Sequence, residues 1–148
     1  MPAAGARVRE VGPRDAAPLA DLLGELGYPV SPAEVARRLG RDAEHVLVAE
    51  EGGQPVGMVA VTVELLIVHA APVARITALV VGAAARRGGV GRLLVGAAVE
   101  WARTRGCEGV ELTSGIRPER AASHRFYEGL GFARTSYRFW LPLDGASR

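Results

Sequence analysis

A stretch rich in glycine and arginine at residues 80–94 is the part of the chain whose residue types first suggest chemistry. An apolar run over residues 76–81 leads into it, and a strongly periodic helical pattern follows it. The first turn of a helix has backbone N–H groups without intrahelical partners and the positive end of the helix dipole. Glycines let an anion approach those groups, and arginines add forked donors for phosphate oxygens; here they are Gly88, Gly89, Gly91, Arg86, Arg87 and Arg92. The stretch therefore predicts a diphosphate-binding loop.

The loop lacks the residues of two common nucleotide-binding motifs. A Walker loop needs Gly-Lys-Ser/Thr, and the chain contains no lysine; a dinucleotide fingerprint needs G-x-G-x-x-G near the start of a βαβ unit. Instead, Arg86-x-x-Gly89-x-Gly91 resembles the R/Q-x-x-G-x-G/A signature of the GNAT N-acetyltransferases. Residues 123–132 resemble a second segment of that family, A-H-x-F-Y-E-x-x-G-F, with Ser123 where alanine is usual. Two motifs in the right order favour this family over a nucleotide binder of another fold.

The resemblance implies acetyl-CoA as cosubstrate and no metal. It implies that the loop binds the pyrophosphate, that a backbone N–H near Val80 or Val81 stabilises the oxyanion, and that the Tyr127 hydroxyl lies beside the departing sulfur. The cofactor-binding residues implied in this way are Leu79, Val80, Val81, Arg86, Arg87, Gly88, Gly89, Val90, Gly91, Arg92, Ser123, Phe126 and Tyr127.

Acetyl transfer to an amine also requires a base, because an alkylammonium with a pKa of about 10.4 is mostly protonated at pH 7. Tyr127 is the candidate donor to the thiolate, and Glu111, His124 and Glu64 are the candidate bases. No acid stands in the strand before the loop, where some family members have a glutamate. Direct base catalysis from that strand is therefore not expected.

The leading hypothesis is transfer of an acetyl group from acetyl-CoA to a primary amine of a small molecule or of a peptide or protein, by direct attack in a ternary complex. The alternative is a GNAT-like domain that binds acyl-CoA as a sensor or structural ligand without turnover. The acceptor stays open, although Asp42, Glu44 and Glu64 could attract a cationic amine.

Periodicity and turn residues place these motifs on an ordered series of elements. Strands are expected at residues 7–11, 45–50, 55–68, 74–81, 110–113 and 134–141. Helices are expected to begin after the cap Asp15, at the capping box of Ser31 and Glu34, in the loop helix from Val90, and at Pro118. The predicted fold is α/β (α+β): a GNAT-like, mixed, mostly antiparallel sheet of about six to seven strands with about four helices. A splayed parallel pair, ending at Val81 and Thr113, would hold the acyl-CoA.

Bulk properties predict one domain over residues 1–148, with 49% hydrophobic and 23% charged residues. Net charge is only +2, and the basic residues, all arginine, are scattered outside the loop, so neither a nucleic-acid partner nor a membrane partner is expected. The lone Cys107 excludes an intramolecular disulfide. Without a signal peptide or a long apolar run, the expected compartment is cytoplasmic. The apolar last strand leaves a homodimer possible.

Overall fold

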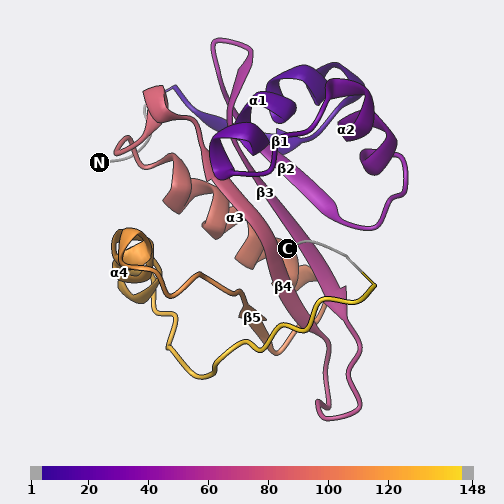
Figure 1. The fold of residues 1–148 in the computed structure, drawn as a ribbon, viewed down its shortest axis with the longest axis vertical. Coiled ribbons are helices and arrows are strands. Elements are labelled where there is room, and N and C mark those ends of the chain that lie inside the picture. The colour runs from indigo at the N-terminus through magenta and orange to yellow at the C-terminus, as the bar shows by residue number, and fades with distance from the viewer. Residues whose placement is uncertain (1–4, 145–148) are drawn as a thin grey trace. The chain divides into compact units, whose positions relative to one another are not determined.

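A mixed sheet of five strands, in the spatial order β1-β2-β3-β4-β5, organises the computed structural model, which describes residues 5–144 (Figure 1). The strands are β1 (Arg7–Glu10), β2 (His45–Glu51), β3 (Gln54–Glu64), β4 (Val73–Val81) and β5 (Gly109–Glu111). The first four are antiparallel, and β5 runs parallel to β4. This order confirms the predicted mixed, mostly antiparallel sheet.

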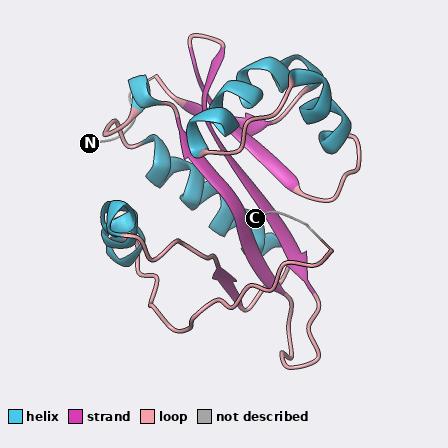
Figure 2. Cartoon of the chain, viewed as in Figure 1, coloured by secondary structure: helices cyan, strands magenta, loops and turns pink. Residues whose placement is uncertain are grey.

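Four helices accompany the sheet (Figure 2). They are α1 (Ala16–Leu26), α2 (Pro32–Leu39), α3 (Val90–Thr104) and α4 (Ala121–Gly129). The chain forms two units, of which the first runs up to Leu112 and holds the sheet with α1, α2 and α3. The second unit begins at Thr113 and contains α4.

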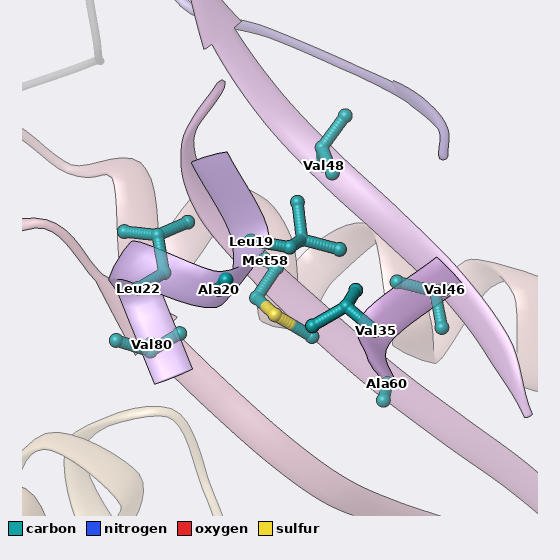
Figure 3. Packing of buried hydrophobic residues seen from close by; sticks show 9 residues of the cluster. All are labelled: Leu19, Ala20, Leu22, Val35, Val46, Val48, Met58, Ala60 and Val80. Carbon is teal, nitrogen blue, oxygen red and sulfur yellow. The ribbon is translucent and has the colours of Figure 1, made fainter. Parts of the chain in front are cut away.

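Helices α1 and α2 pack on one face of the sheet in the first unit. Their apolar side chains meet those of β2, β3 and β4 in one buried cluster (Figure 3): Leu19, Ala20, Leu22, Val35, Val46, Val48, Met58, Ala60 and Val80. Burial of each large aliphatic side chain contributes about 1.5–3 kcal/mol relative to exposure. The cluster fixes the strands that lead to the glycine-rich loop.

Helix α3 covers the opposite face, where Val61, Ala74 and Ala102 are buried together. Its close approach depends on Gly57, because a Cβ there would lie 3.0 Å from Leu94 Cδ1 and 3.2 Å from Val90 Cγ1. The buried side of α3 consists of Val90, Leu94, Val95, Ala98 and Ala102, and the start of α3 is held against β3.

A β-bulge interrupts the pairing of β3 with β4. Ala60 pairs with Ala78, whereas the next residue, Val61, pairs with Ile76, so Thr77 has no partner of its own. An extra residue of this kind shifts the alternation of side chains between the two faces. Ile76 follows Ala74 on the α3 face, whereas Ala78 packs against the cluster of α1 and α2.

The predicted strand at residues 134–141 is wrong, because the structure has no strand there and the sheet has five strands, not six to seven. Tyr137 and Phe139 in this stretch are 84% and 92% exposed. A strand requires a hydrogen-bonded neighbour, and an alternating apolar pattern does not supply one. The strand predicted over residues 55–68 is also too long: β3 ends at Glu64, which pairs with Val73, the first residue of β4.

Two helix caps differ in detail from the prediction. The Asp15 carboxylate accepts a hydrogen bond from the Gly12 N–H (2.7 Å) and binds Arg9, and does not cap α1. Ser31 Oγ accepts the expected bond from the Glu34 N–H (3.1 Å), but the Glu34 carboxylate binds Arg37 and Arg38 instead of closing the box. These arginines lower the pKa of Glu34 to about 2.

Candidate functional site

The loop between β4 and α3 presents backbone N–H groups at the start of α3. After a turn of 3-10 helix at Ala83–Ala85, Arg87 and Gly89 adopt left-handed conformations with φ of 69° and 85°. The first intrahelical bond of α3 runs from the Leu93 N–H to the Gly89 carbonyl. The N–H groups of residues 87–92 have no backbone acceptor among the described residues, so this end of α3 has the donors and dipole that bind an anion.

Contacts within the first unit hold the loop in place. The Gly82 N–H donates to the Val56 carbonyl (2.8 Å), and the Ala83 N–H donates to Glu25 of α1 (2.9 Å). Arg86 Nε donates to the Val81 carbonyl (3.1 Å), and its guanidinium lies 3.8 Å from Glu25. Arg86 is therefore directed partly toward the end of β4, whereas Arg87 and Arg92 are exposed and form no ion pair in the part of the chain that the structure describes.

The edge of β4 beside the loop is open. Strand β5 pairs only with residues 73–75, and residues 76–81 have no partner on that side within residues 5–144. Leu79, Val80 and Val81, expected at the cofactor, lie on this open part. Unpaired peptide groups along a strand edge can bind an extended ligand that carries amides.

The second unit holds the other predicted site residues on α4. The Tyr127 ring makes edge contacts with Phe126 and Phe132, with ring centroids 5.2 and 5.8 Å away. Burial raises the pKa of the Tyr127 hydroxyl, with Arg120 opposing the shift. Ser123 is half-buried on the same helix, and His124 Nε2 lies 2.7 Å from the Gly115 carbonyl oxygen.

The two carboxylates expected as bases lie in the first unit, near the end of the sheet away from the loop. Glu111 in β5 forms an ion pair with Arg75 (3.1 Å), and Glu64 is the last residue of β3. Cys107 is half-buried and packs against the cluster under α3.

Sequence reasoning missed Thr77. Its hydroxyl donates to the Glu44 carboxylate, and the Ala60 carbonyl oxygen lies 3.3 Å from the same hydroxyl. The bulge that isolates Thr77 arises from the register between two strands, which leaves no local signal in the sequence.

A hollow of about 470 Å³ opens in the first unit where β3 runs on past the start of β2. Within it, the rings of His45 and Trp101 stack with centroids 4.4 Å apart. Its lining comprises Asp42, Ala43, Glu44, His45, Val61, Thr62, Val63, Leu65, Pro72, Trp101 and Arg105. Since Pro72 precedes β4 and the glycine-rich loop follows it, the hollow and the loop lie at opposite ends of that strand.

No helix in residues 5–144 is both long and apolar enough to cross a membrane. No group of three or more His, Cys, Asp or Glu residues in this range is arranged to hold a metal ion.

Comparison with known proteins identifies the family. Residues 17–132 match the model of the acetyltransferase (GNAT) family. An aminoalkylphosphonate N-acetyltransferase of Salmonella typhimurium is 32% identical over 122 residues, which are 82% of this chain and 78% of the relative. A Trypanosoma brucei acetyltransferase superposes with a TM-score of 0.80 at 27% identity, covering 93% of this chain and 99% of the other. A putative acetyltransferase from Agrobacterium tumefaciens superposes with a TM-score of 0.80 at 29% identity, covering 92% of this chain and 99% of the other. The chain therefore belongs to the GNAT family of acetyltransferases.

Proposed function

We propose that the protein transfers an acetyl group from acetyl-CoA to a primary amine, by direct attack of the amine within a ternary complex. The observation that carries this proposal is the open end of α3, where unpaired N–H groups and the exposed Arg87 and Arg92 follow the open edge of β4. A pyrophosphate at the helix start and a pantetheine arm along residues 76–81 would occupy both features.

The residues proposed for cofactor binding are divided by role. The loop from Arg86 to Arg92 would bind the pyrophosphate, while a backbone N–H near Val80 or Val81 would stabilise the oxyanion. Ser123 and Phe126 would contact the cofactor from α4, and the Tyr127 hydroxyl would donate to the departing sulfur. This part of the proposal rests on the match of residues 123–132 to the family motif, and it requires both units to act as one domain.

The acceptor is proposed to be a small primary amine. The Salmonella relative is named for aminoalkylphosphonates, which carry such an amine. An amine with the reference pKa of lysine costs about 4 to 5 kcal/mol to deprotonate at pH 7, so the reaction needs a base. Glu111, Glu64 and His124 are the proposed candidates, and of these the Glu111 carboxylate already forms an ion pair with Arg75.

Calorimetry with acetyl-CoA and free CoA, followed by thiol release over a panel of amines, tests the proposal. We expect micromolar binding, competition by CoA but not by ATP, and turnover of at least one amine. Gly89→Glu should abolish binding, because it places a carboxylate at the anion site and a side chain at φ 85°. Gly53→Glu is the matched control, since Gly53 has φ 82° in the turn between β2 and β3.

Two other outcomes would count against the enzyme hypothesis or against the loop as its cofactor site. Binding without turnover of any amine would favour a sensor or structural role for the acyl-CoA. Equal binding by the Gly89 variant and wild type would reject the loop as the pyrophosphate site.

A further inference from the structure

The bulge in β4 brings a hydroxyl and a carboxylate together on an open part of the sheet. Thr77 is the extra residue of the bulge, is exposed, and donates its hydroxyl proton to Glu44, in the segment before β2. The two residues are thus joined across β3. A bonded pair of this type can pass a proton, because the hydroxyl oxygen accepts one as its own moves to the carboxylate.

This pair lies beyond the area that α1 and α2 cover. The cluster under those helices extends as far as Val46 in β2 and Ala60 in β3, as Figure 3 shows. The bulge begins directly after Ala60, so the part of the sheet beyond it lies outside this cluster. Thr62 and Arg75, which pair with each other, follow on the face opposite Val61 and Ala74. This half of the face is therefore polar.

Thr77 is also close to the proposed reaction centre. It follows Ile76, the first residue of β4 without a β5 partner, and precedes Val80 by three residues, about 10 Å along a strand. An acceptor amine on the open face could contact the Thr77 hydroxyl while it approaches an acetyl group beside β4.

The hydrogen bond from Thr77 distinguishes Glu44 from the two carboxylates proposed above as bases. Glu44 and Glu64 form no ion pair among the described residues, whereas Glu111 is paired with Arg75 at 3.1 Å. The other charged or titratable groups near this half of the sheet are Asp42, His45, Glu64 and Arg105. Because Glu44 is exposed, a proton that it accepts can pass to water.

We propose that Thr77 and Glu44 together accept the proton of the acceptor ammonium, which names the base for the proposed acetyl transfer and rests on it. The ammonium gives one proton to Thr77 Oγ1 as the hydroxyl proton moves to Glu44, and Glu44 releases it to water. The neutral amine forms the C–N bond and the C–S bond breaks. The second proton of the amine goes to the thiolate, so the products are the amide, the free thiol and one proton in solution.

The test is the pH dependence of kcat/KM for a simple alkylamine in wild type, Glu44→Gln and Thr77→Val. Without the pair only the neutral amine reacts, and at pH 7 that is about one molecule in 2,500 for a pKa of 10.4. We expect kcat/KM of both variants to be about 100-fold below wild type at pH 7, to rise about tenfold per pH unit, and to approach wild type near pH 9. Thr77→Ser should keep the wild-type profile, because it retains the hydroxyl.

An acceptor with a weakly basic amine provides the second readout. An α-amine with a pKa of about 7.7–8.0 is largely neutral near pH 8, so the variants should match wild type there within about threefold. A purely structural defect would lower kcat/KM equally for both acceptors. Glu51→Gln, an exposed carboxylate at the end of β2, is the control and should leave both profiles unchanged.

The outcomes separate this inference from the proposed function. Wild-type protein that acetylates no amine would overturn the proposed function itself. If wild-type protein turns over an amine and the pH profiles of Glu44→Gln and Thr77→Val have the same shape as that of wild type, acetyl transfer stands but the pair is rejected as the base.

Discussion

A tyrosine hydroxyl can donate to a departing sulfur only while it keeps its proton. Burial raises the pKa of Tyr127 above its ordinary value of 10.0, which keeps the phenol protonated at neutral pH. Its rate effect should therefore show no ionisation of its own near pH 7. The edge contacts with Phe126 and Phe132 fix the ring, so that the hydroxyl is the only part that a change to phenylalanine removes.

We expect Tyr127→Phe to lower kcat by about 10- to 1,000-fold, which overlaps the roughly 100- to 10,000-fold typical of general acid catalysis, with little change in CoA affinity. Steady-state kinetics and calorimetry on the same preparation measure the two effects. Tyr137→Phe is the matched control, because Tyr137 is 84% exposed and lies outside the motif. Unchanged turnover in Tyr127→Phe would show that this tyrosine only packs.

Single residues were predictable where the backbone demands them. Gly89 at φ 85° and the hairpin glycines Gly52 and Gly53 have the left-handed conformations that glycine favours. Contacts between distant segments were not predictable. Neither the bond from Arg86 to the Val81 carbonyl nor that from Thr77 to Glu44 follows from the residue types, because each depends on how segments are brought together in space.

At the scale of elements, a buried ion network joins β1, β2 and the start of α1. Arg9 binds both oxygens of Asp15 at 2.8 and 3.0 Å and donates from Nε to Glu50 at 2.7 Å, and Arg7 binds the other oxygen of Glu50. Asp15 is 1% exposed. The bonds from Arg9 lower the pKa of Asp15 below its usual 3.8, although burial opposes the shift.

We expect Asp15→Asn to destabilise the protein by about 3 kcal/mol at pH 7, because it removes one of the two buried carboxylates that bind the Arg9 guanidinium and leaves only Glu50. A carboxyl with a lowered folded-state pKa stabilises the protein above its unfolded-state pKa of about 3.9, and this contribution is lost as the pH falls toward the folded-state value. Urea unfolding from pH 7 to pH 3 should thus show a smaller loss of stability in the variant than in wild type. Asp21→Asn, at an exposed position of α1, should behave as wild type; an equally small effect of Asp15→Asn would contradict this account.

Elements were predictable to the extent that their patterns are local. The helix expected from Val90 is confirmed, and Gly52 and Gly53 form the turn between two of the expected strands, because the helical period and the turn residues are encoded in neighbouring positions. The strand expected at residues 134–141 has the same alternating pattern as a real strand, but strand formation also requires a partner elsewhere in the chain. The pattern alone therefore predicted one strand too many.

At the scale of the whole molecule, the residues proposed for cofactor binding belong to two units: the loop and β4 to the first, and α4 to the second. A ligand that binds only the folded state lowers the population of opened states by a factor of one plus the ratio of the free ligand concentration to its Kd, which is about 100-fold at 100 times the Kd. If the cofactor contacts α4, it should therefore protect the second unit from opening, even though the glycine-rich loop belongs to the first.

Limited trypsin digestion measures this protection. Arg120 is exposed immediately before α4, and we expect saturating acetyl-CoA to slow cleavage after it by about tenfold or more, since cleavage follows the population of opened states. Cleavage after Arg41, in the exposed segment between α2 and β2, is the internal control and should keep its rate. Gly89→Glu should remove the protection at Arg120, because the ligand no longer binds. Calorimetric binding without protection at Arg120 would mean that the loop binds the cofactor without α4, and Tyr127 would then lose its proposed role at the sulfur.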